Sequence, residues 1–92
     1  KEVRDMVSKK ITIKNESGLH ARPAAILAQA AMKCNSEITI VTPEKTVNPK
    51  SILNIMAAAI KKGTEIELQC EGAAEKEDLE TLAQLIESGL GE

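Results

Sequence analysis

His20 and Arg22 are the two residues whose types and spacing most clearly point to chemistry. They lie in segment 18–24, GLHARPA, and His20 is the only histidine of the chain. Loop-forming residues precede the segment and helix-forming residues follow it, so we expect His20 at a helix start. There the backbone N–H groups point outward and the helix dipole is positive, which suits a phosphate. An imidazole is nucleophilic and largely neutral at physiological pH.

Covalent phosphoryl transfer is therefore one interpretation of this segment: His20 attacks a phosphoryl group, and Arg22 holds its oxygens with a planar fork of donors. The other interpretation is that His20 ends a loop and that Arg22 is ordinary solvated surface. The local residues alone leave both open.

Ser51 is the second candidate residue. It precedes a helix-forming apolar stretch, where a serine normally acts as an N-cap. It could also be a regulatory phosphorylation site, because a phosphate at a helix N-terminus is compatible with the fold. The neighbouring Lys50 either serves an approaching partner or keeps the surface soluble.

The helix that follows Ser51 is unusually rich in large apolar residues. They are Ile52, Leu53, Ile55, Met56 and Ile60, more than one buried stripe needs. We assign Ile55 and Ile60 to the core, and expect Ile52, Leu53 and Met56 to stay exposed as a docking patch. The alternative is a helix that is more deeply buried.

The alternation of apolar residues predicts an α+β fold. A period of two indicates strands, and a period near 3.6 together with helix-forming composition indicates helices. Four strands, each with one apolar face, fit a mainly antiparallel sheet with three helices on one face, an open-faced sandwich. The expected elements, in the order βαββαβα, are strand 10–14, helix 22–33, strand 37–41, strand 46–47, helix 51–61, strand 65–70 and helix 75–88.

Composition narrows the class of protein. The chain has 92 residues, no aromatic residue and a net charge of −2, which argues against a nucleic-acid partner. It has no apolar run long enough for a membrane span, and its charged first residues lack the apolar core of a signal peptide, so we expect a cytoplasmic protein without membrane insertion. Cys34 and Cys70 lack metal-ligand spacing and are interpreted as reduced, small apolar residues. With no glycine-rich nucleotide loop either, we expect neither a metal nor a cofactor.

Several motifs in register resemble the HPr family, the histidine phosphocarriers of the bacterial sugar phosphotransferase system. They are GLHARPA at 18–24, TVN at 46–48, KSI at 50–52 and the final GLGE. The resemblance runs from about Ser8 to the C-terminus. It implies an N-terminal extension or flexible start over residues 1–7 and a single HPr-like domain over 8–92.

The resemblance also implies roles. His20 would accept a phosphoryl group on Nδ1 from enzyme I and pass it to enzyme IIA domains, with Arg22 steadying the phosphate. The protein would then be a monomeric carrier and not an independent enzyme.

The resemblance further implies that Ser51 is modified by HPr kinase/phosphorylase, which favours binding to a catabolite-control transcription regulator. The family's interface with its partners maps onto the exposed patch, which comprises Ile52, Leu53 and Met56, with Lys50 beside it. A second hypothesis is a non-catalytic regulatory module that acts through Ser51 and this patch. The presence of His20 counts against that role alone, although both roles can coexist.

Four features depart from the family's usual pattern. Asn54 stands where glycine is common, Pro49 replaces an apolar residue, Ala74 replaces a better capping residue, and residues 57–59 are all alanine. Those at 49, 54 and 57–59 concern the second helix and its partner affinity, and all four leave His20 and Arg22 unchanged.

Overall fold

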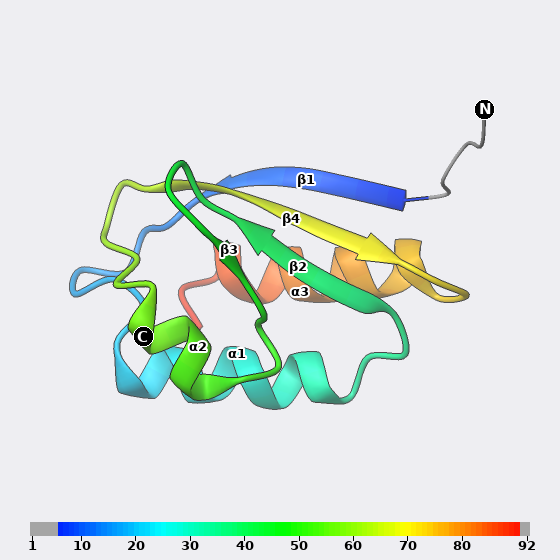
Figure 1. Ribbon diagram of the computed structural model, residues 1–92, viewed down its shortest axis with the longest axis horizontal. Coiled ribbons are helices and arrows are strands. Elements are labelled where there is room, and N and C mark those ends of the chain that lie inside the picture. The colour runs from blue at the N-terminus through cyan, green and yellow to red at the C-terminus, as the bar shows by residue number, and fades with distance from the viewer. Residues whose placement is uncertain (1–5, 91–92) are drawn as a thin grey trace.

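The computed structural model describes residues 6–90, in which four strands and three helices follow the order βαββαβα (Figure 1). The elements are β1 (Met6–Thr12), α1 (Ala21–Met32), β2 (Glu37–Val41), β3 (Thr46–Val47), α2 (Ile52–Ala57), β4 (Glu65–Glu71) and α3 (Glu75–Glu87). Among these described residues, no helix is long and apolar enough to cross a membrane.

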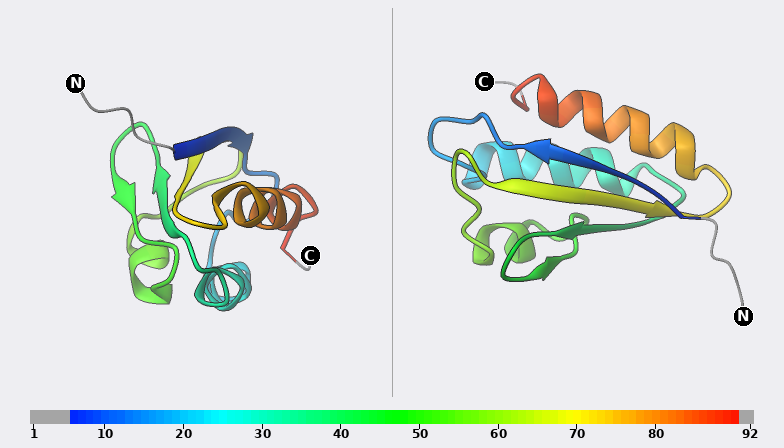
Figure 2. Two further views of the ribbon diagram at one scale, coloured as in Figure 1. Left: turned by 90° about the vertical axis from the view of Figure 1, so that its right-hand side faces the viewer. Right: turned by 90° about the horizontal axis from the view of Figure 1, so that it is seen from above.

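The strands form one antiparallel sheet in the order β1-β4-β2-β3. The register places Ile66 of β4 opposite Ile11 of β1, and Leu68 of β4 opposite Ile40 of β2. Two views show all three helices on the same side of the sheet, so its other face is open (Figures 1 and 2). The predicted open-faced α+β sandwich is confirmed.

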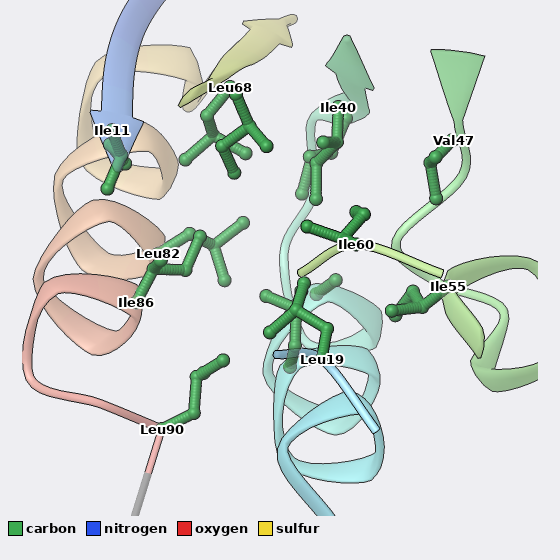
Figure 3. Packing of buried hydrophobic residues seen from close by; sticks show 14 of the residues in the cluster. Ile11, Leu19, Ile40, Val47, Ile55, Ile60, Leu68, Leu82, Ile86 and Leu90 are labelled. Atoms are coloured by element: carbon green, nitrogen blue, oxygen red, sulfur yellow. The ribbon is translucent and has the colours of Figure 1, made fainter. Parts of the chain in front are cut away.

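The core lies between the sheet and the helices (Figure 3). The strands alternate as predicted, with Ile66, Leu68 and Cys70 of β4 buried. On α1 a stripe of Leu27 and three alanines is fully buried, and on α3 Leu82, Ala83 and Ile86 are buried. Because burial of apolar surface is the main force that favours folding, this layer holds the elements that carry the candidate residues.

The first strand starts earlier than the sequence pattern predicts. Met6 and Val7, which we assigned to the N-terminal extension, are the first two residues of β1 and pair with Glu71 and Cys70. The polar residues at 8–10 interrupt the apolar alternation, so the sequence pattern does not reveal the start of this strand. Pairing with β4 supplies its hydrogen bonds. The rest of the expected extension, residues 1–5, lies outside the described residues.

The second helix is shorter than predicted, because it ends at Ala57 instead of near Lys61. Two residues later Ala59 has a φ of +53°, a left-handed conformation that terminates a helix. The predicted helix end at residue 61 is therefore wrong. Gly63, with a φ of +88°, belongs to the turn before β4.

Candidate functional site

A short loop between β1 and α1 positions His20. Its residue Gly18 has a φ of +70°, and the next N–H group, that of Leu19, donates to the Ile60 carbonyl at 2.9 Å. A Cβ atom on Gly18 would lie 2.2 Å from that same carbonyl oxygen. Only glycine allows this close approach, so the loop is fixed against the segment that follows α2.

His20 is the N-cap residue of α1 and its side chain is exposed. Its backbone is extended, with φ −81° and ψ −164°, and its carbonyl accepts the N–H of Ala24 at 2.9 Å. The N–H groups of Ala21 and Arg22 precede this first helical hydrogen bond and project from the helix end, while Pro23 has no N–H. The predicted helix start at His20 is confirmed to within one residue.

Arg22 lies exposed in the first turn of α1, and residues 21–24 include no acidic side chain. A guanidinium, outward-pointing N–H groups and the positive end of the helix dipole therefore lie at the same helix end as the imidazole. Such a set can stabilise the charge of a phosphoryl group bound to the ring.

Ser51 is the N-cap of α2, as predicted. Its hydroxyl oxygen accepts the N–H of Asn54 at 3.1 Å, and its own N–H donates to the Asn48 carbonyl at 3.1 Å. The Asn54 side chain closes the ring, because its Oδ1 accepts the Asn48 N–H at 2.8 Å. The departure from glycine at position 54 thus adds a hydrogen bond to the Ser51 turn. The spacing Ser-x-x-Asn resembles a capping box and could have revealed it.

Lys50, the charged residue of the expected interface, contacts the backbone of the segment before β2. The side chain is half-buried, and Nζ donates to the Ser36 carbonyl at 3.2 Å. This bond uses one of the three N–H donors of the ammonium group.

The apolar patch itself is exposed as predicted. The exposed fractions are 40% for Ile52, 80% for Leu53 and 42% for Met56, whereas Ile55 and Ile60 are buried. One face of α2 therefore packs against the molecule, and the other offers large apolar side chains to solvent.

The two candidate sites lie at opposite ends of α2. Ser51 begins the helix, whereas Ile60, whose carbonyl holds the His20 loop, follows its C-terminal end. α1 and α2 pack against each other. The structure therefore places His20, the apolar patch and Ser51 on one connected pair of helices, without bringing the histidine and the serine into one site.

The hydrogen bonds of two polar residues, Asn15 and Asp78, were not predicted from the sequence. Asn15 is buried and donates from Nδ2 to the Gly89 carbonyl at 2.7 Å. Asp78 of α3 accepts the N–H groups of Asn35 and Ser36 at 3.2 and 2.9 Å. The Ser36 side chain and these two N–H groups lower the pKa of Asp78. No local pattern reveals such contacts, because each joins residues at least 42 positions apart.

The two cysteines are free thiols, Cys70 being buried and Cys34 half-buried. Burial raises the pKa of Cys34, and raises that of Cys70 to about 11. A thiol with a raised pKa is a poor nucleophile at neutral pH. Among residues 6–90, no group of three or more histidine, cysteine or acidic side chains could hold a metal ion.

These features define a class of protein: a small open-faced α+β sandwich with an exposed histidine and an arginine at the start of a helix. A sequence model of the family described as "PTS HPr component phosphorylation site" matches residues 7–88. The phosphocarrier protein HPr of Mycoplasma capricolum is 49% identical over 72 residues, which cover 78% of this chain and 81% of the relative. The HPr-like protein Crh of Halalkalibacterium halodurans is 45% identical over 82 residues, covering 89% and 98%.

Among solved structures, HPr-C-His from Thermoanaerobacter tengcongensis aligns with a TM-score of 0.87 at 44% identity, covering 94% of this chain and 97% of that one. The chain belongs to the HPr family of phosphocarrier components of the phosphotransferase system. The resemblance seen in the sequence is thereby confirmed.

Proposed function

We propose that His20 is the residue that carries the phosphoryl group. The observation that supports this most strongly is the exposed imidazole at the N-terminus of α1, beside Arg22 and outward-pointing N–H groups. The imidazole nitrogen, which we take to be Nδ1, forms a bond to phosphorus as the bond between phosphorus and the donor breaks, and the reverse exchange passes the group on. The donor is phosphorylated enzyme I, which is released without its phosphoryl group, and the acceptors are enzyme IIA domains.

The chain acts in this scheme as a carrier and not as an independent catalyst. The exposed patch of Ile52, Leu53 and Met56 is the surface on which successive partners dock. Because partners must exchange rapidly, we expect a monomer in the cytoplasm that forms transient complexes. An HPr dimer from Thermoanaerobacter tengcongensis aligns with a TM-score of 0.74 at 44% identity, over 100% of this chain and 99% of that one. Analytical ultracentrifugation measures the oligomeric state of this chain directly, and a dimer at micromolar concentration contradicts the expected monomer.

Incubation with phosphoenolpyruvate and enzyme I tests the carrier role. The expected product is the mass of one added phosphate, which is lost in acid because phosphohistidine is acid-labile. His20→Ala should abolish this labelling, whereas Ser51→Ala should retain it. An unlabelled wild-type chain, or equal labelling of His20→Ala, contradicts the proposal.

A regulatory role through Ser51 is the second candidate, and the similarity to HPr-like protein Crh favours it. In this role HPr kinase/phosphorylase modifies the hydroxyl, and the product binds a catabolite-control transcription regulator. A phosphate at the N-cap of α2 meets outward-pointing N–H groups, so the fold tolerates the modification. ATP-dependent, acid-stable labelling should survive His20→Ala and disappear in Ser51→Ala. Its absence with an active kinase leaves Ser51 as a simple cap.

A further inference from the structure

The loop of residues 13–19 positions the His20 side chain, because it connects β1 to His20, the N-cap residue of α1. Its far end is fixed by the hydrogen bond from Leu19 to Ile60. Its near end is fixed at Ile13, whose N–H donates to the Thr64 carbonyl at 2.9 Å and whose carbonyl accepts the Gly63 N–H at 2.8 Å. Between these two ends lies Asn15, one of two buried polar residues in the described part of the chain. Only 4% of Asn15 is exposed.

Asn15 makes two separate links. Its carbonyl accepts the N–H of Gly18 at 2.9 Å, which closes the turn that leads to His20. Its side-chain Nδ2 donates to the Gly89 carbonyl at 2.7 Å, a partner 74 positions away in the chain. The first link shapes the loop, and the second ties that loop to the end of α3.

The Gly89 carbonyl lies just after the C-terminal end of α3, a segment that is fixed by its own hydrogen bond and core packing. Gly89 has a φ of +94° and Leu90 a φ of +52°, and the N–H of Leu90 donates to the Leu85 carbonyl at 3.1 Å. Leu90 is fully buried in the core (Figure 3). The carbonyl that Asn15 binds is therefore held by a well-packed helix terminus, and movement of the loop away from it requires the loss of a partly buried hydrogen bond.

We infer that Asn15 is a positioning residue for His20, which it serves by fixing the loop against the end of α3. This inference rests on the proposed role of His20 as phosphoryl carrier. An asparagine fits the position because its amide donates to a carbonyl and carries no charge into the core. An aspartate of the same shape would place a carboxylate oxygen against the Gly89 oxygen, and an alanine would leave that carbonyl without its donor.

The test compares phosphoryl acceptance from enzyme I in Asn15→Asp, Asn15→Ala and the wild type. Ile86→Val, which removes one buried methylene group from the core face of α3 and leaves the Asn15 side chain intact, serves as the control for lost stability. Rates are measured where urea curves show every variant to be folded. We expect kcat to fall about tenfold in the Asn15 variants, because a misplaced reacting group loses its favourable geometry. KM should not change, because the patch on α2 is untouched, and Ile86→Val should keep the wild-type kcat.

Two outcomes overturn the inference: an unchanged kcat in a folded Asn15 variant, or a loss no larger than that of Ile86→Val. Hydrogen exchange gives an independent reading in whichever Asn15 variant folds. The Gly18 and Leu19 amides should exchange about tenfold faster than in the wild type, and unchanged exchange also contradicts the role. If the wild type itself takes no phosphate, the proposed function fails together with this inference. If the wild type is labelled and the Asn15 variants match it, only the inference fails.

Discussion

At the scale of single residues, the His20 loop depends on backbone geometry as much as on side chains. At Gly18 the chain has a left-handed conformation and passes against the Ile60 carbonyl, where no side chain fits. Gly63 has an equally unusual φ, yet a Cβ atom there would meet no atom within 4 Å. The two glycines separate two effects that are usually mixed, the strain of a positive φ and the collision of a side chain with its surroundings.

Gly18→Ala should therefore destabilise the fold much more than Gly63→Ala. An alanine at positive φ costs about 1–2 kcal/mol at either position. At position 18 the collision with Ile60 adds about 1–3 kcal/mol, because the backbone must move apart. Urea unfolding of both variants measures the difference. If both variants lose the same free energy of unfolding, the loop can move away from Ile60 without an energetic cost.

At the scale of elements, α2 shows where sequence patterns succeed and where they stop. Its start at Ser51, the burial of Ile55 and the exposure of Leu53 follow from capping preference and helical spacing. Its end does not, because the run of alanines at 57–59 favours a helix that continues. Instead Ala59 turns left-handed and Ile60 presents its carbonyl to Leu19. This distant contact outweighs local propensity.

Replacing Ala59 by glycine should stabilise the protein. Relief of the left-handed strain is worth about 1–2 kcal/mol, and the extra freedom of glycine in the unfolded chain offsets about 0.4–1 kcal/mol. We expect a net gain of about 0.5–1 kcal/mol in the free energy of unfolding, read from urea titration.

Ala57→Gly is the matched control, because Ala57 is helical and the same substitution should cost about 0.5–1 kcal/mol there. A loss of stability in Ala59→Gly would contradict the account of how α2 ends. A change of the same sign in the free energy of unfolding of both variants would also contradict it.

At the scale of the whole molecule, local periodicity predicted which segments form the sheet and which form the helices. Hydrogen bonds between residues that are distant in the sequence hold these elements together. Strands β2, β3 and β4, the apolar faces and His20 at a helix start could be predicted from short segments, whereas the first part of β1 could not. The bonds from Asn15 to Gly89 and from Asp78 to Asn35 and Ser36 could not be predicted either, because nothing in the neighbourhood of Asp78 distinguishes it from the other acids in the first turn of α3. Their effect on stability is therefore best tested directly.

Asp78 should make the stability of the fold depend on pH in the acidic range. The Ser36 side chain and two backbone N–H groups lower its pKa in the folded protein below the ordinary 3.8. The unfolded chain therefore binds the proton more tightly, and the stabilisation is present above pH 3.8 and is lost as the pH falls through the lower folded value. Asp78→Asn should cost about 1 kcal/mol at pH 7, a magnitude reduced by partial exposure to solvent.

Urea unfolding of the wild type and Asp78→Asn between pH 7 and pH 2.5 measures this dependence. The difference in free energy of unfolding should be largest near neutrality and shrink as the carboxylate of the wild type becomes protonated. Glu80→Gln provides the control, since Glu80 is exposed on the same helix and its replacement should produce little change at any pH. A difference for Asp78→Asn that stays constant down to pH 2.5 would mean that its charge does not hold the start of β2 against α3.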